Sequence, residues 1–150
     1  MKIQNIANFK TRLMIGNGIF LSKLLFGIQL YGGSEDFLLN SLQTVMNKAA
    51  RAIARRDKRT PTRDLLNQLG WMSVRQLVFY HSVLLVFKVR KTGYPVYFAD
   101  KLTEGYTYNT RNSQGNVIRM GEQFRAKNSI TTKSWRWRGA NNFNHLPSEI

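Results

Sequence analysis

Apolar residues recur at helical spacing through most of the first 93 residues of this 150-residue chain. The clearest stripe is Leu38, Leu42, Val45, Met46, Ala49 and Ile53. Because a helical turn takes 3.6 residues, this spacing predicts an amphipathic helix with one face in a core. We expect the helix to start at a Ser34 cap, with acidic residues in its first turn, and to extend to about Arg55.

Glycine and proline divide the same region into further predicted helices. Residues 3–30 have helical apolar spacing, but Gly16 and Gly18 each cost about 1 kcal/mol in a helix interior. We therefore expect a break or a close packing contact near Asn17. After Pro61 the sequence predicts a short helix, 63–69, that is capped by Thr62 and stopped by Gly70.

A capping box precedes the last helix of this region. The Ser73 hydroxyl and the Gln76 side chain are spaced to satisfy each other's free backbone amides. Gly93 follows this helix, at the position where many helices end with a residue in the left-handed conformation, usually glycine. The expected apolar face of this helix is Leu77, Val78, His81, Leu84, Leu85 and Val89.

Beyond Gly93 the helical spacing weakens and glycine, asparagine and threonine become frequent. The predicted fold is mainly α: a small bundle of about four helices over 1–93, followed by an irregular, basic, aromatic-rich C-terminal extension over 94–150. Residues 117–120 are a candidate short strand, and one short hairpin in the extension stays open as an alternative. The extension is either laid over the helices or an arm that orders on a partner.

The charge balance is the strongest functional signal. The chain has 23 Lys and Arg against 8 Asp and Glu, a net charge of +15. Such an excess favours a polyanionic partner, most commonly nucleic acid, with an anionic membrane surface or simple solubility as alternatives. Residues 13–33 include Lys23 and five glycines, so we interpret them as a buried helix and expect no membrane association. The absence of cysteine is compatible with a nuclear or cytoplasmic protein.

Three basic groups are the candidate nucleic-acid-binding residues. The first combines the end of a helix with the loop after it: Arg51, Arg55, Arg56, Lys58, Arg59 and Arg63. Several cations there can reach successive phosphates, whereas the alternative is a solvated loop or a nuclear-import signal. The second group is Lys88, Arg90 and Lys91, where the helix dipole alone would also favour cations. Arg111 in the extension is added to these.

The third group alternates bases with aromatic rings: Lys133, Trp135, Arg136, Trp137 and Arg138. Indole rings stack on unpaired bases while arginines hold the backbone, a combination suited to single strands. The same alternation is typical of a half-buried strand with both indoles packed on the helices. Both interpretations stay open at this stage.

Catalytic and cofactor-binding patterns are missing from the sequence. The two histidines are far apart, and His81 falls on an apolar helix face, where a core histidine is more common than a ligand. There is no paired-carboxylate metal motif, Gly-rich phosphate loop or nucleophile elbow. Phe98-Ala99-Asp100 continues with Lys101 where a polymerase motif needs a second acid. We expect no catalytic centre, no metal and no cofactor in this chain.

Motif order resembles the region downstream of the polymerase core in non-LTR (LINE-type, jockey-like) retrotransposon reverse transcriptases. The resemblance is carried by Leu42–Arg51 (LQTVMNKAAR), Thr60–Thr62, Leu65–Val74, Tyr80–His81, Val86–Lys88, Lys91–Tyr97, Asn109–Ser113 and Asn144–Pro147. The order of these segments carries the resemblance more than any one of them. One departure is Phe143, which stands where the family has tryptophan.

The resemblance implies a fragment of an RNA-directed DNA polymerase: the thumb and post-thumb region, without the catalytic palm. In such enzymes thumb helices grip the backbone of the template–primer duplex. By this likeness Lys48, Arg51 and residues 55–59 face RNA, DNA or their hybrid, and Trp71 with three leucines (Leu65, Leu66 and Leu69) holds the short helix. The rest of the polymerase polypeptide is the implied partner. The alternative function is a non-catalytic helical protein-interaction module whose basic surface serves solubility or import.

Overall fold

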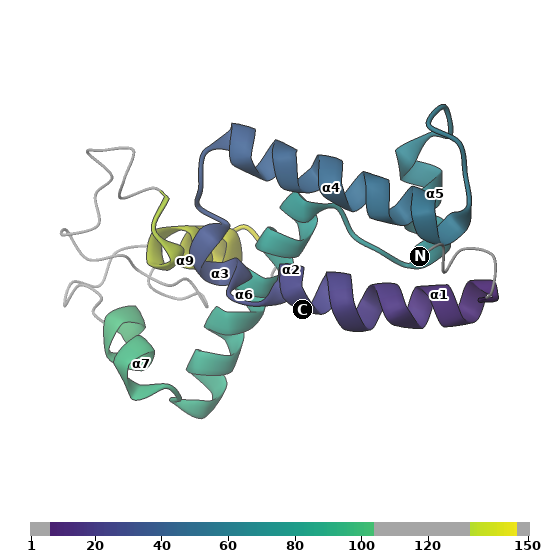
Figure 1. The fold of residues 1–150 in the computed structure, drawn as a ribbon. Helices are drawn as coiled ribbons and strands as arrows, with labels where there is room; N and C mark the ends of the chain where they lie inside the picture. Colours follow the sequence, from purple (N-terminus) through teal and green to yellow (C-terminus); the bar gives the residue numbers. More distant parts are fainter. Residues whose placement is uncertain (1–6, 104–132, 147–150) are drawn as a thin grey trace. The chain divides into compact units, whose positions relative to one another are not determined.

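The computed structural model describes residues 7–103 and 133–146, and these ranges are mainly helical and contain no β-strand (Figure 1). The predicted mainly-α fold is therefore confirmed. The chain divides into two compact units, Met1–Ile28 with Ser34–Leu77 and Gln29–Gly33 with Val78–Ile150. The division falls inside one long helix, and each unit is described separately below. The candidate strand at 117–120 and Arg111 lie outside the described residues.

The N-terminal segment is helical but not regular. Its elements are α1 (Phe9–Ile15), the π-helical η2 (Gly16–Leu21), α2 (Ser22–Leu25) and α3 (Ile28–Tyr31). The Asn8 side chain caps α1 by accepting a hydrogen bond from the Thr11 amide at 2.8 Å. The wide π turn begins at Gly16, which agrees with the irregularity expected near Asn17. A Cβ at Gly16 would overlap Cδ1 of Ile53, so the absence of a side chain allows close packing there.

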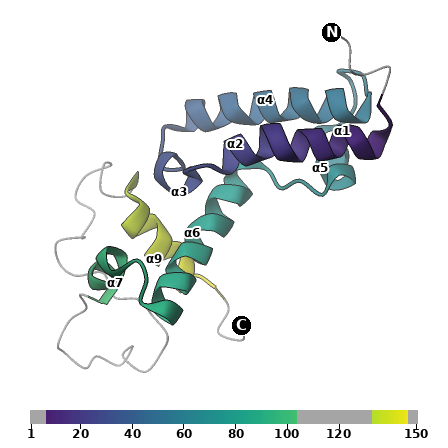
Figure 2. The same cartoon turned by 60° about the horizontal axis from the view of Figure 1, so that its bottom comes forward.

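The long helix α4 (Asp36–Ala54) runs alongside α1 and η2 within the first unit (Figures 1 and 2). Its C-terminal end agrees with the prediction. Its N-terminal end does not, because Glu35 and not Ser34 occupies the cap position and makes no side-chain capping hydrogen bond. The Glu35 carbonyl accepts from the amides of Leu38 and Leu39. The helix therefore begins one residue later than a Ser34 cap requires.

The buried face of α4 is rotated from the predicted stripe. Met46 and Ile53 are buried as expected, and Leu39 and Ala50 complete the face. Leu38 and Val45 are instead exposed, at 45% and 49%. Apolar residues lie on more than one side of this helix, so spacing alone does not decide which side meets α1 and α5.

Helix α5 (Thr62–Leu69) packs on α4 through Leu65, Leu66 and Leu69, all of which are buried. Pro61 and not Thr62 is its cap residue, so the helix begins one residue earlier than predicted, and Gly70 ends it at a φ of +67°. The next residue, Trp71, is buried, stacks on Phe20 at 5.7 Å, and its indole N–H donates to Oδ1 of Asn17 at 2.8 Å. Trp71 thus joins α5 to the π-helical turn.

Helix α6 (Val74–Thr92) begins with the predicted capping box. The Ser73 amide donates to the Gln76 side chain at 2.9 Å, and the Gln76 amide donates to the Ser73 hydroxyl at 3.4 Å. The Gln43 side-chain oxygen on α4 accepts from the Val74 amide at 2.8 Å and satisfies a further free donor. Gly93 closes the helix at a φ of +69°.

The described parts of the C-terminal extension are helical, which corrects the expectation of an irregular chain there. They are α7 (Val96–Thr103) and α9 (Trp135–Asn144). The Ser134 hydroxyl caps α9 by accepting from the Trp137 amide at 3.3 Å. The half-buried strand considered for the Trp-Arg-Trp-Arg run is therefore wrong, because a local cap starts a helix at this point.

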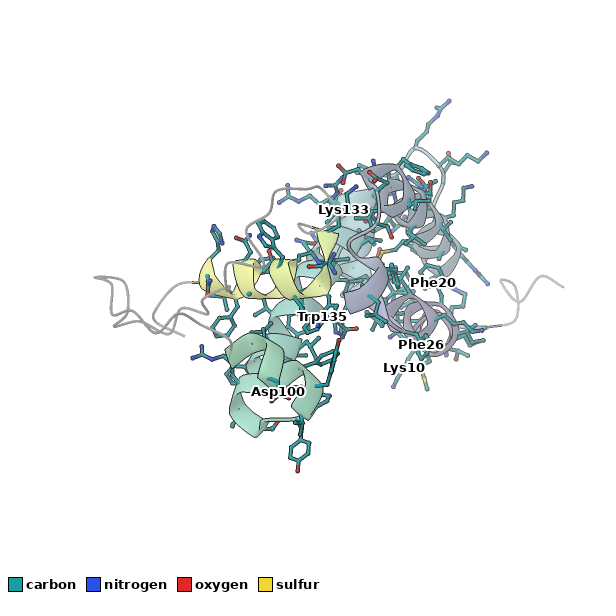
Figure 3. All side chains as sticks on the ribbon, turned by 90° about the vertical axis from the view of Figure 1, so that its left-hand side faces the viewer. Lys10, Phe20, Phe26, Asp100, Lys133 and Trp135 are labelled. Atoms are coloured by element: carbon teal, nitrogen blue, oxygen red, sulfur yellow. The ribbon has the colours of Figure 1, made fainter. Side chains whose placement is uncertain are left out.

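The second unit has a small core between α6, α7 and α9. Val86 and Ala140 are buried against each other, with Leu102 and Phe143 packed around them. A Cβ at Gly139 would lie 2.9 Å from Cγ2 of Val86, so α9 approaches α6 closely at this glycine. Figure 3 shows Trp135 on α9 and Asp100 on the neighbouring α7. Phe143 thus serves this core where the resembling family has tryptophan.

No helix within 7–103 or 133–146 is by itself long and apolar enough to cross a membrane. Helices α5 and α6 reach that length and composition only as a bent pair.

Candidate nucleic-acid interface

A basic depression opens at the C-terminal end of α4. It has a volume of about 730 Å³ and is lined by Lys48, Arg51, Ala52, Arg55, Arg56, Asp57 and Lys58. Five of these seven side chains are cations and one is an acid. The structure therefore gathers four of the six residues of the first predicted group around one open space, together with Lys48, which only the family resemblance had indicated.

Helical spacing explains how α4 delivers part of this set. Lys48, Arg51 and Arg55 stand three and four residues apart, on the side of the helix that faces away from its buried residues. At 1.5 Å per residue the row spans roughly 10 Å along the helix axis. Ala52 lies between them with a short side chain, which leaves room for a ligand between the longer cationic side chains.

The end of α4 turns the remaining cations into the depression. Arg55 adopts a left-handed conformation with φ 52° and ψ 45°, and the Arg56 amide donates to the Arg51 carbonyl at 3.1 Å. This reversal ends the helix and brings Arg56 and Lys58 back beside it. The last carbonyls of α4 also add a negative partial charge that favours cations at this end.

Arg51 is the least exposed cation of the depression. Its Nη2 donates to the Thr62 hydroxyl at the start of α5 at 3.2 Å, while its Nε is buried without a hydrogen-bond partner. The Thr62 contact holds the guanidinium against α5 and leaves its outer edge toward the depression. Sequence reasoning selected Arg51 but missed Thr62, because nothing in the local pattern links residues eleven positions apart.

Arg12 is a cation of a different kind. Its Nε donates to the Ile53 carbonyl at 2.8 Å and its Nη1 to the Ala7 carbonyl at 2.6 Å. The Ile53 carbonyl is near the end of α4, where the last carbonyls of a helix have no amide of the next turn to donate to them. Arg12 therefore serves the structure of the first unit, and the sequence carried no signal for that role.

The other two residues of the first predicted group, Arg59 and Arg63, are exposed but do not line the depression. Arg59 lies in the loop after α4, and Arg63 lies in the first turn of α5. Both are close in sequence to the depression and extend its positive charge along the loop.

The second predicted group lies in the second unit, at the end of α6. Lys88, Arg90 and Lys91 are exposed. The Arg90 guanidinium lies over the ring of Phe143 at 5.3 Å, and the Lys91 ammonium lies over Phe87 at 6.0 Å. These cation–π contacts and the helix dipole at the last turn of α6 account for the positions of Arg90 and Lys91 without a bound ligand.

The third predicted group is half-buried in the second unit. Trp135 packs on Phe98 of α7 with ring centroids 4.3 Å apart. Arg136 donates to the Tyr97 hydroxyl at 3.0 Å and lies over its ring at 5.7 Å. These contacts join α9 to α7, so packing accounts for the tryptophan and the arginine without a bound base.

Arg138 is engaged with the backbone of its own unit. Its Nη2 donates to the Gln29 carbonyl at 2.6 Å and its Nη1 to the Lys133 carbonyl at 3.2 Å. Burial lowers the pKa of the guanidinium and leaves its Nε without a partner. This side chain links segments 109 residues apart, and its donors are directed inward.

The described residues do not form a cluster of side chains that could bind a metal ion. Among 7–103 and 133–146, no three His, Asp or Glu side chains are placed to hold a metal ion. His81 is half-buried beside Tyr80, with ring centroids 5.2 Å apart, and burial followed by the charge of Lys88 lowers its pKa. Among the seven residues that line the basic depression, Asp57 is the one carboxylate and none is a histidine.

Comparison with protein-family models, curated proteins and solved structures finds no match to this chain.

Proposed function

We propose that this chain binds the phosphate backbone of nucleic acid in the basic depression at the end of α4. The observation that carries the proposal is the gathering of five cations with a single carboxylate around one open space. A site of this charge repels cations and attracts a polyanion. RNA, DNA and their hybrid all offer the same phosphates.

The composition of the depression favours backbone contacts over base reading. None of its seven lining residues is aromatic, so the depression lacks the aromatic rings on which successive bases of a single strand stack. Arginine and lysine bind phosphate oxygens without regard to sequence. The expected binding is therefore strong at low salt, weak in sequence preference and steeply dependent on ionic strength.

The motif order described above supports a more specific proposal: the chain is the thumb-like part of a non-LTR reverse transcriptase. In that role it grips the template–primer backbone while another part of the polypeptide carries the palm. Lys48 and Arg51 belong both to the motif LQTVMNKAAR and to the depression. The coding sequence upstream of Met1 tests this proposal, which requires an in-frame palm with paired aspartates.

A matched pair of charge reversals tests nucleic-acid binding. The variant Arg56→Glu/Lys58→Glu changes two exposed lining residues, and Lys10→Glu/Lys23→Glu makes the same change in charge at two exposed residues of the N-terminal segment. The two variants have the same net charge as each other. Figure 3 shows Lys10 on the N-terminal segment. We expect the first to weaken binding much more than the second, with equal melting temperatures.

Salt titration gives the second measurement. Five phosphate contacts predict a slope of log K against log[salt] of roughly −4 to −5 on duplex DNA. The depression variant should reduce that slope by roughly 2. A slope near zero for the unmodified chain, or equal losses in the two variants, would contradict the proposal.

Exposed apolar residues support the alternative of a protein-interaction module. Phe37 on α4 is 66% exposed and Phe26 is 88% exposed. Large exposed side chains of this kind are typical of surfaces that another protein covers. The charge-reversal pair separates the two functions, because an interaction module keeps its partner when the cations of the depression are reversed.

A further inference from the structure

Two threonines flank Pro61: Thr60 lies in the loop between α4 and α5, and Thr62 is the first residue of α5. Figure 1 shows this loop joining the ends of the two helices. The Thr62 hydroxyl accepts a hydrogen bond from Arg51. The Thr60 hydroxyl has no hydrogen-bond partner among the residues that the structure describes. Of the two, Thr60 therefore has the hydroxyl that is free to react.

Thr60 also has a sequence context that Thr62 lacks. It is followed by Pro61 and, three positions on, by Arg63, and no other serine or threonine in the chain precedes a proline. An acceptor hydroxyl, then proline, then a basic residue at the third position is the pattern that one class of protein kinases selects. Arg63 is exposed on the first turn of α5.

The local structure makes the loop accessible to an enzyme. Residues 55–59 and Pro61 are exposed. The hydrogen bonds within the loop are short-range: the amides of Lys58 and Thr60 donate to the side chain and carbonyl of Asp57 at 2.6 and 3.1 Å. A segment with such local contacts can extend into an enzyme cleft at small cost in stability.

We propose that Thr60 is the acceptor of a proline-directed kinase, and that its phosphate closes the basic depression to nucleic acid. The second half of this inference rests on the proposed function. In the transfer, the Thr60 Oγ forms a bond to the γ-phosphorus of a nucleoside triphosphate. The bond from that phosphorus to the bridging oxygen breaks, the nucleoside diphosphate leaves, and the hydroxyl proton passes to a base of the kinase.

The position of Thr60 explains the effect on binding. Its amide lies 3.1 Å from the carbonyl of Asp57, which lines the depression. The lining has five cations and one carboxylate, a net charge of +4. A phosphothreonine adds about −2 and lowers this to about +2, while its oxygens occupy arginine donors that would otherwise bind nucleic acid.

The expected size of the effect follows from counterion release. Losing one to two phosphate contacts reduces the salt slope by roughly 1 to 2. At 0.15 M salt this corresponds to binding that is roughly 5- to 30-fold weaker. A nearby acid on its own, as in Thr60→Glu, should give a smaller loss because it carries half the charge.

The test uses the full chain, a proline-directed kinase with MgATP, and mass spectrometry of the products. We expect one phosphate on Thr60, none on Thr60→Val, and little on Pro61→Ala. Binding of the phosphorylated chain to duplex DNA should then fall by the stated factor and return after phosphatase treatment. Thr60→Val serves as the binding control and should bind DNA as the unmodified chain does, with an unchanged circular dichroism spectrum.

Two results would overturn the proposal. One is an unmodified Thr60 when a free peptide containing Thr60–Arg63 is phosphorylated under the same conditions. The other is a phosphorylated chain with unaltered DNA affinity. If the unmodified chain does not bind DNA at all, the proposed function fails, and the phosphate count from mass spectrometry still decides the modification site by itself.

Discussion

The indole N–H of Trp71 donates to the side-chain oxygen of Asn17 at 2.8 Å, across 54 positions of the sequence. Trp71 is 5% exposed and stacks on Phe20, so its one polar atom needs a partner inside the first unit. The π turn that begins at Gly16 carries Asn17. The irregular π-helical turn therefore provides the hydrogen-bond acceptor for Trp71, which follows α5.

Asn17→Ala should lower the free energy of unfolding by about 1 kcal/mol, because it leaves the Trp71 N–H with water at best. Trp71→Phe removes the donor together with part of the buried ring. In the double variant the loss should be smaller than the sum of the two single losses. Urea unfolding of the four proteins measures this coupling, and strictly additive losses would mean that the hydrogen bond contributes nothing.

Arg55→Gly should make the protein more stable and a weaker nucleic-acid binder at the same time. Arg55 is left-handed at φ 52°, a conformation that glycine adopts without steric cost. We expect a gain of about 1 kcal/mol in unfolding free energy. The same change removes one cation from the depression and should reduce the salt slope by roughly 1.

Arg56→Gly is the matched control, since Arg56 does not have a positive φ. It should lose a similar amount of binding without the gain in stability. Thermal melting and salt titration of the two variants separate the backbone effect from the charge effect. A less stable Arg55→Gly protein would contradict the assigned backbone conformation.

Arg12→Ala should destabilise the first unit and leave the salt slope unchanged. The substitution deprives the Ile53 carbonyl at the end of α4, and the Ala7 carbonyl, of their donor. Hydrogen bonds from a charged group contribute about 1.5 to 3 kcal/mol, and the loss should approach the lower figure because Arg12 is half-buried. Binding to duplex DNA below the melting temperature provides the second readout, and a reduced salt slope would place Arg12 among the binding cations.

The second unit should lose stability at acid pH through His81. Burial, followed by the charge of Lys88, lowers its pKa below the ordinary value of 6.5. The folded state thus prefers the neutral ring, so this contribution is present above pH 6.5 and is lost as the pH falls from there toward the folded-state pKa. Melting temperatures measured from pH 8 to pH 5 should fall less for His81→Gln than for the unmodified chain.

Much of the helix pattern could be predicted because its signals are local. The capping box of Ser73 and Gln76 joins residues three apart, and Gly70 and Gly93 end helices by a conformation that belongs to one residue. The basic composition at the end of α4 and in the loop after it is equally local, and it was enough to predict Arg51, Arg55, Arg56 and Lys58, which the structure gathers into one depression.

The remaining features depend on which segments meet. The apolar spacing of α4 permits more than one buried side, and contact with α1 and α5 selects Leu39 and Ala50 over Leu38 and Val45.

Cations that look alike in the sequence also divide by their partners. Arg12 and Arg138 donate to distant carbonyls, whereas Arg55 and Arg56 line an open depression. Sequence alone therefore determined the helical class, most helix ends and the positive charge of the chain. Tertiary structure decided which helix faces are buried and which cations are free to bind, because both depend on residues far away in the chain.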